Sequence, residues 1–183
     1  MGYLLLLAGL ALWSLAHFWK RIAPASRARW GEAGKGIAAL ALIASIVLMV
    51  LGYRAAGGPV WWGPHPALVG INNLLVLVAV YLFVASLSNV RASRMPHPQL
   101  HATAIWAVAH LLPNGDLRSL VLFGGLLLWA AAEIVVLNRT APYHVAPDKP
   151  LAQAPEWLVA AIALAAYAVI ALVHGWLGPW PFG

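Results

Sequence analysis

The chain has 183 residues, of which 63% are hydrophobic and only 9% are charged, and its mean hydropathy is +0.83. Water-soluble domains contain about 45–50% apolar and about 25% charged residues, so the composition excludes an ordinary soluble domain. The absence of cysteine excludes a disulfide framework, thiolate metal ligands and a cysteine nucleophile. The formal net charge of +6 does not indicate a nucleic-acid partner, because the basic residues lie in short segments between apolar runs.

Six apolar segments predict an all-α fold, a polytopic integral membrane bundle of about six transmembrane helices that forms one domain over residues 1–183. The segments cover residues 3–19, 36–53, 67–88, 99–112, 117–137 and 156–177. A helix needs about 20 apolar residues to cross a hydrocarbon core of about 30 Å. The fourth segment, between Pro98 and Pro113, is short. We expect it to complete its crossing through the preceding turn at 94–98.

The distribution of basic residues predicts the orientation of the chain in the membrane. Nine of the eleven Lys and Arg residues follow the first, third and fifth segments, and only Arg54 and Arg118 lie on the other side. Basic loops stay in the cytoplasm, so we expect a multi-pass inner-membrane protein with both termini in the periplasm. No basic residue precedes the first segment, which favours a retained anchor over a cleaved signal peptide. Four prolines predict an irregular cytoplasmic loop over 138–156.

Histidine is the most informative polar residue, with seven copies against five acidic residues. In this topology three lie toward the cytoplasm (His17, His97, His101), three toward the outside (His65, His110, His174) and His144 in a loop. A single intramembrane histidine is most simply a packing residue. Several in one small bundle favour a metal or haem site, because neutral imidazole is a common ligand. No H-E-x-x-H pair is present, which argues against zinc.

The turn between the fourth and fifth segments contains Asn114-Gly115-Asp116. We expect Gly115 to adopt a positive φ or an otherwise tight turn. Asp116 is well placed to cap the fifth helix. The alternative for Asp116 is an additional hydrogen bond to His110, which would raise the basicity of that imidazole as a ligand.

Other polar or small residues inside the spans also carry expectations. Gly124-Gly125 predicts a close contact between helices, and Asn72-Asn73 is the pair that we expect to line a cavity. Glu133 is expected to form a salt bridge with Arg29 or Arg139, or to act instead as a proton carrier.

The chain resembles the NnrU family of six-span membrane proteins, named for a role in nitrite and nitric oxide metabolism. The resemblance rests on His97-Pro98, on Trp106-Ala107-Val108-Ala109-His110-Leu111, on Asn114-Gly115-Asp116 and on Phe123-Gly124-Gly125 followed by Trp129 and Glu133. The N-terminal part is also similar, with His17 near the end of the first span and Gly31-Glu32 before the second. The similarity covers most of residues 3–139.

A more distant similarity to plant 15-cis-zeta-carotene isomerases implies a haem b whose iron is ligated by His17 and His110. The resemblance adds His97 as a further cofactor-binding residue, and Asn114, Gly115, Asp116 and Glu133 as residues that support the site. Ala107 stands where the isomerases have a cysteine, so thiolate ligation is not expected here.

The helical rise gives a different pairing of the histidines. His17 and His110 should differ in depth by about 12 Å, whereas two axial ligands of one iron need similar depths. Depth alone pairs His17 with His97 or His101, and His110 with His174 or His65.

Three functions remain open from the sequence. The protein is a haem enzyme acting on a hydrophobic polyene or binding nitric oxide, a non-enzymatic accessory factor or sensor that contacts partner membrane proteins, or a bundle whose histidines only pack. All three place the chain in a lipid bilayer.

Overall fold

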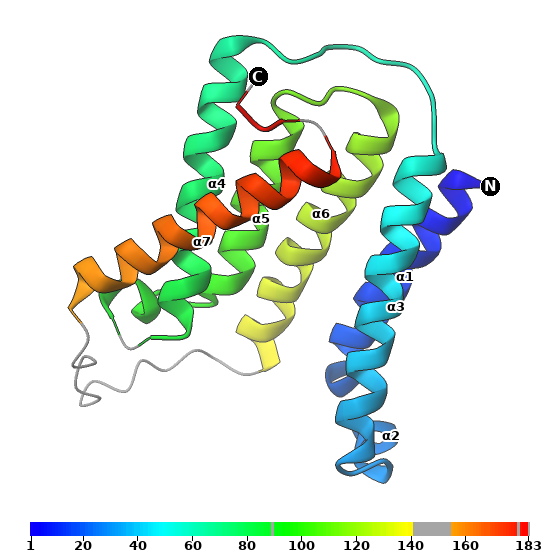
Figure 1. Cartoon of the computed structure of the whole chain (residues 1–183). Helices are drawn as coiled ribbons and strands as arrows, with labels where there is room; N and C mark the ends of the chain where they lie inside the picture. The colour runs from blue at the N-terminus through cyan, green and yellow to red at the C-terminus, as the bar shows by residue number, and fades with distance from the viewer. Residues whose placement is uncertain (89, 141–154, 179, 183) are drawn as a thin grey trace.

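The computed structural model describes residues 1–88, 90–140, 155–178 and 180–182, and all regular structure in them is helical (Figure 1). The elements are α1 (Gly2–Ile22), α2 (Pro24–Arg29), α3 (Ala33–Ala55), α4 (Pro66–Ser86), the 3₁₀ helix η1 (Arg91–Arg94), α5 (Pro98–Leu111), α6 (Leu117–Thr140) and α7 (Glu156–Leu177). The all-α prediction is confirmed. Most of the loop predicted over 138–156 lies outside the described residues, and α6 continues to Thr140.

Five helices are long and apolar enough to cross a membrane, namely α1, α3, α4, α6 and α7. The fourth predicted span is α5, which has only 14 residues and a length of about 21 Å. The turn expected at 94–98 is present before α5, and the sixth crossing stays a prediction. The segment forms η1, and His97 then takes a left-handed conformation with φ 51°. Pro98 disfavours a right-handed helical conformation at the residue before it, which separates η1 from α5.

The helices form two groups that meet at α6. In one group α1 and α3 pack along each other as an antiparallel pair, and in the other α5 lies between α4 and α6 while α7 packs against α4 (Figure 1). The contact between the groups is made mainly by α1 against α6. Buried Leu6, Met49 and Trp129 form its core, with Leu126 and Ala130. The α1–α6 interface is therefore the seam of the molecule.

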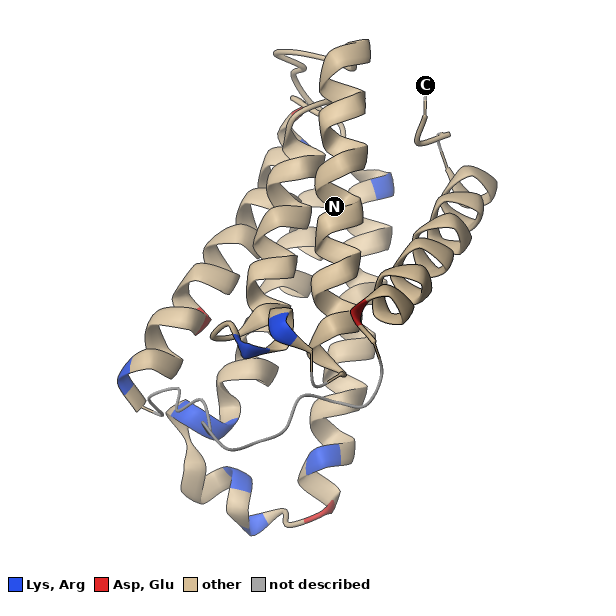
Figure 2. Ribbon diagram, turned by 90° about the vertical axis from the view of Figure 1, so that its left-hand side faces the viewer, with Lys and Arg blue, Asp and Glu red and all other residues tan. Residues whose placement is uncertain are grey.

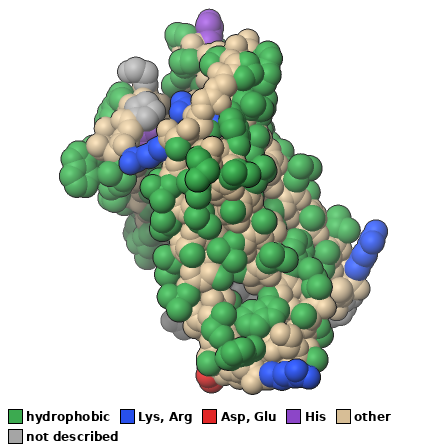
Figure 3. Space-filling view, turned by 90° about the vertical axis from the view of Figure 1, so that its right-hand side faces the viewer, with side chains coloured by type: hydrophobic (Ala, Val, Ile, Leu, Met, Phe, Trp, Pro, Cys, Tyr) green, Lys and Arg blue, Asp and Glu red, His purple; other side chains and the backbone are tan. Residues whose placement is uncertain are grey.

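Many large apolar side chains lie on the surface, as the hydrophobic composition predicts. Large side chains such as Leu40, Leu74 and Leu128 are 68%, 62% and 72% exposed, and apolar side chains cover the face formed by α1 and α3 (Figure 3). Exposed apolar area on this scale is unfavourable in water and favourable against lipid acyl chains. The protein is therefore a multi-pass membrane protein.

Charged residues gather at the ends of the bundle, and most Lys and Arg lie at the end away from the two termini (Figure 2). The two arginines that depart from this pattern both have local partners. Arg54 donates to the carbonyl oxygen of Leu177 (3.3 Å). Arg118 pairs with Asp116 (3.3 Å) and lies over the ring of Tyr53 (4.8 Å). The placement of both termini in the periplasm stays a prediction.

The segment between α3 and α4 pairs with the turn between α5 and α6. The backbone N–H of Trp61 donates to Gly115 (2.9 Å), and that of Gly115 donates to Trp62 (3.1 Å). The indole N–H of Trp62 donates to the carbonyl oxygen of Leu112 (3.0 Å) at the end of α5. A Cβ at Gly115 would overlap the Trp62 ring. Gly115 does not have a positive φ. The predicted alternative is confirmed, a tight turn that other residues enter only at a cost, because a side chain there would overlap the indole.

Candidate functional site

His17 lies at the seam between α1 and α6, and its ring is held between two tryptophans. The centroid of its imidazole is 4.4 Å from that of Trp13 and 4.5 Å from that of Trp129, and the two indoles contact each other edge to face. The Nδ1 of His17 lies 2.9 Å from the carbonyl oxygen of Trp13. A carbonyl only accepts, so Nδ1 carries the proton, and Nε2 of the neutral ring presents its lone pair. An imidazole oriented in this way is prepared to bind a metal or a hydrogen-bond donor.

Three polar atoms near His17 are buried and have no hydrogen-bond partner among the described residues. They are Nε1 of Trp13, Nε1 of Trp129 and Oε2 of Glu133. Trp129 and Glu133 are only 6% and 7% exposed and lie one helical turn apart on α6. Buried polar groups are normally satisfied, so these three atoms are candidates for bonding a further group.

Glu133 does not form the salt bridge that the sequence led us to expect with Arg29 or Arg139, so that prediction is wrong. Its carboxyl interacts electrostatically with His17, Arg21 and His97 instead. Arg29 lies at the end of the short α2 helix, beyond α1. Arg139 follows Glu133 by six residues, which places it on another face of α6. The groups that act electrostatically on the acid therefore lie on α1 and before α5, and two of them are candidate histidines.

His110 occupies a similar environment near the other end of the bundle. Its Nδ1 lies 2.9 Å from the carbonyl oxygen of Trp106, so its Nε2 is also presented. Its ring stacks on Phe123 at 4.8 Å and contacts Trp106 at the same distance. His110 interacts electrostatically with His174. The local geometry of His17 is thus repeated at His110, since each imidazole bonds the carbonyl four residues before it.

The rings of His17 and His110 contact α6 at different residues. His17 contacts α6 at Trp129, and His110 contacts it at Phe123. These positions are six residues apart, which corresponds to about 9 Å along the helix axis. The offset has the same sense as the depth difference estimated from the sequence, and His174 is close enough to His110 to act on it electrostatically.

His97 lies at the entrance to α5 and is the only described non-glycine residue with a positive φ. Its Nε2 is 3.0 Å from Oδ1 of Asn138 on α6. Its carbonyl oxygen accepts the amides of Leu100 and His101 in the first turn of α5. The side chain therefore joins α5 to the end of α6, on the side where Glu133 lies.

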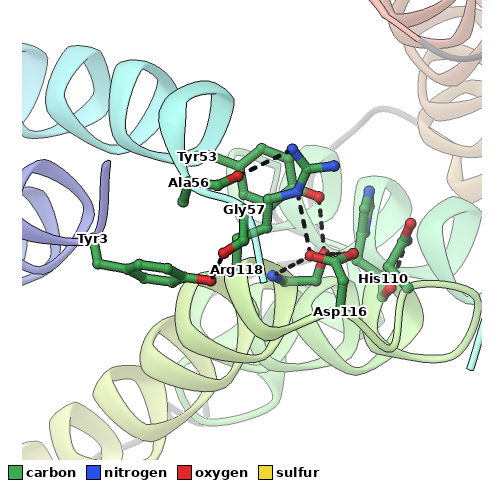
Figure 4. A network of polar contacts seen from close by, with 9 residues as sticks. Tyr3, Tyr53, Ala56, Gly57, His110, Asp116 and Arg118 are labelled. Carbon is green, nitrogen blue, oxygen red and sulfur yellow. Dashed lines mark hydrogen bonds and ion pairs between the residues drawn. The ribbon is translucent and has the colours of Figure 1, made fainter. Parts of the chain in front are cut away.

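The predicted cap at the start of α6 is confirmed (Figure 4). Asp116 accepts the backbone N–H of Ser119 through Oδ1 (3.1 Å) and its hydroxyl through Oδ2 (2.8 Å). Ser119 also bonds the hydroxyl of Tyr53 on α3 (2.8 Å). Asn114 donates to the carbonyl oxygen of His110 (2.8 Å). Between these well-described residues, no hydrogen bond joins the carboxylate of Asp116 to the ring of His110.

The remaining expectations for small and polar residues are met in part. A Cβ on Gly125 would lie 2.8 Å from Leu10 of α1, so this glycine is at a helix contact as predicted, whereas Gly124 has nothing within 4 Å. Asn72 is buried and donates to Asn73 (3.1 Å). Oδ1 of Asn72 has no hydrogen-bond partner among the described residues, so its expected place beside a cavity stays a prediction.

Within the described part of the chain, no group of three or more His, Asp or Glu side chains is arranged to hold a bare metal ion. A prosthetic group that supplies most of the iron ligands itself needs only one or two imidazoles. The donor set around His17 fits such a group, because it offers one imidazole nitrogen with unsatisfied hydrogen-bonding groups beside it.

Sequence analysis missed the part played by Trp13 and Trp129 around His17. The spacing in the sequence could have indicated it, since Trp13 precedes His17 by four residues and Trp129 precedes Glu133 by four. Positions four apart share a helix face. Two such pairs on different spans are a pattern that could have placed these four residues together.

Of the comparisons with known proteins, the one with family models gives a match. No curated protein and no solved structure matches the chain. The family model described as NnrU protein matches residues 5–181, nearly the whole length. The matched region includes all the helices described above except the first residues of α1. The chain therefore belongs to the NnrU family.

Proposed function

We propose that this NnrU-family membrane protein binds haem b and ligates its iron through Nε2 of His17. The observation that carries the proposal is the setting of that imidazole. Its Nδ1 is fixed by the carbonyl oxygen of Trp13, its ring lies between two indoles, and the N–H groups of both indoles are buried without a partner among the described residues. His110 has the first of these features, and Phe123 and Trp106 take the place of the indole pair.

The offset between the two histidines favours a haem with one protein ligand over a haem ligated from both sides. Haem held by a single histidine, when bound, provides an iron position at which a diatomic molecule binds. We therefore propose nitric oxide as the ligand, in keeping with the family's link to nitrite and nitric oxide metabolism. A polyene isomerase with two axial histidines would need His17 and His110 at similar depths.

The residues of this chain have distinct tasks in the proposal. Trp13 and Trp129 orient the imidazole of His17 and exclude lipid from it. The carbonyl oxygen of Trp13 holds the proton on Nδ1 and increases electron donation from Nε2. Leu6, Met49 and Leu126 pack the seam between α1 and α6.

The test is an absorbance spectrum of the purified protein with pyridine haemochrome quantitation, repeated for His17→Ala, His110→Ala and His97→Ala. His144→Ala is the control, since His144 lies outside the described residues and the family resemblance gives it no role. We expect loss of haem in His17→Ala and retention in the control and in His110→Ala.

Loss of haem in both His17→Ala and His110→Ala would instead support ligation by the two together, and with it the isomerase-like alternative. A colourless wild-type protein that stays colourless after incubation with haem would contradict the proposal and support a cofactor-free accessory role.

A further inference from the structure

We propose that the seam beside His17 holds a buried oxygen group, bonded by the indole N–H groups of Trp13 and Trp129 and by the carboxyl of Glu133. The inference goes beyond the iron ligand, and it depends on the proposed function only for the source of that oxygen group. It concerns three atoms that would otherwise remain unsatisfied inside the protein.

The cost of leaving these groups unsatisfied argues for an occupant. A buried donor or acceptor without a partner costs about 1–3 kcal/mol. In a membrane the surroundings offer no bulk water as a substitute partner. Trp129 and Glu133 are more than nine-tenths buried, so rotation of their side chains to a surface would not satisfy them.

The donors and acceptors define the chemistry of the occupant. An indole N–H only donates, so Trp13 and Trp129 require oxygen lone pairs. Oε2 of Glu133 accepts when ionised and donates when protonated, so it bonds either an O–H group or a second carboxyl with a shared proton. Water and a carboxylic acid both meet these requirements, whereas an apolar ligand meets none of them.

The charge around the seam favours an acidic occupant. Arg21 follows His17 by one turn of α1 and interacts electrostatically with Glu133, as does His97. Both groups thus act on the carboxyl of Glu133, and among the described residues Arg21 forms no ion pair within 4.0 Å. A carboxylate of the bound prosthetic group would complete this arrangement, and haem carries two.

The experiment observes the indole N–H groups directly by ¹⁵N NMR of protein labelled at tryptophan. Spectra are recorded for haem-free protein, for protein loaded with haem and for protein loaded with haem dimethyl ester, which lacks free carboxylates. Trp13→Phe and Trp129→Phe assign the two signals, since each removes an N–H and keeps an aromatic ring. Trp106→Phe is the matched control on α5, where Trp106 packs against His110.

Downfield, hydrogen-bonded N–H signals that appear with haem and are lost with the dimethyl ester would support the proposal with a haem carboxyl as the source. Hydrogen-bonded signals in haem-free protein, with magnetisation exchange to water, would support it with water as the source, even if the protein binds no haem. Signals typical of free indole N–H in all three samples would overturn it.

Glu133→Gln gives an independent check in the same spectra. The change keeps size and one acceptor oxygen but removes the ability to share a proton with a carboxyl. We expect the Trp129 signal to shift and the Trp106 signal to stay unchanged. If neither signal moves while the variant folds normally, Glu133 takes no part in the site.

Discussion

The indole ring of Trp62 occupies the space beside Gly115 in which any side chain would project. This contact joins the segment after α3 to the turn before α6, and each of the two segments donates a backbone hydrogen bond to the other. Trp62 lies far from this turn in the sequence, so the requirement for glycine there is a tertiary one.

We expect Gly115→Ala to destabilise the protein by about 1–3 kcal/mol, the usual cost of overpacking. The added methyl group would displace the Trp62 ring and weaken its hydrogen bond to Leu112. Thermal unfolding in detergent measures the effect. Gly63→Ala is the control, because a Cβ at Gly63 meets nothing within 4 Å. Equal stability of the two variants would show that the indole can move at no cost.

A second prediction concerns the close packing of α1 against α3. A Cβ at Gly52 would overlap the backbone of Leu6, whereas Gly36 on the same helix has open space around it. We expect Gly36→Ala to be neutral or slightly stabilising, because alanine favours helix over glycine. Gly52→Ala should separate the helices and lower the melting temperature. If both substitutions stabilise the protein, the tight contact is not required.

Substitutions of Asp116 separate its capping role from any effect on His110. Its carboxylate bonds Ser119 and Arg118, so Asp116→Ala should cost about 1 kcal/mol through loss of the cap. Asp116→Asn should retain most of that stability, since asparagine caps about as well. We expect an unchanged haem spectrum and reduction potential in Asp116→Asn. A changed potential in a well-folded variant would restore the hypothesis that Asp116 acts on His110.

The orientation of the chain is tested with a reporter fused after Gly183. Since nine of eleven basic residues lie in the segments after the first, third and fifth predicted spans, we expect alkaline phosphatase to be active there, in the periplasm. A cytoplasmic reporter such as green fluorescent protein should be dark at the same position. The opposite pair of results would refute the span count or its parity.

The sequence predicts the helices well because their signal is local. Continuous apolar runs place α1, α3, α4, α6 and α7 within a few residues of their observed bounds. Asp116 was identified as a cap for the same reason, since a cap depends on the amides that directly follow it. The turn before α5 was expected for the same kind of reason, since Pro98 disfavours a helical conformation at His97. The left-handed conformation of His97 was not expected.

The candidate site was predicted only in part, because its geometry depends on which helices meet. His17 and His110 were found through family motifs, and helical rise alone indicated that they lie at different depths. No local pattern could show that the groups acting on Glu133 lie on α1 and before α5, in place of Arg29 or Arg139. That outcome follows from the packing of α1 on α6 around Leu126 and Trp129.

The length of α5 has a consequence for the turns that flank it. At 14 residues it is shorter than its neighbours α4 and α6, which have 21 and 24. Its length of about 21 Å falls short of a hydrocarbon core of about 30 Å, so a crossing at α5 would be completed by the turns on either side of it. Irregular backbone at membrane depth needs hydrogen-bond partners within the protein, and the turn after α5 has them in Trp61 and Trp62. The segment between α3 and α4 would then serve as the substitute for the missing helical turn.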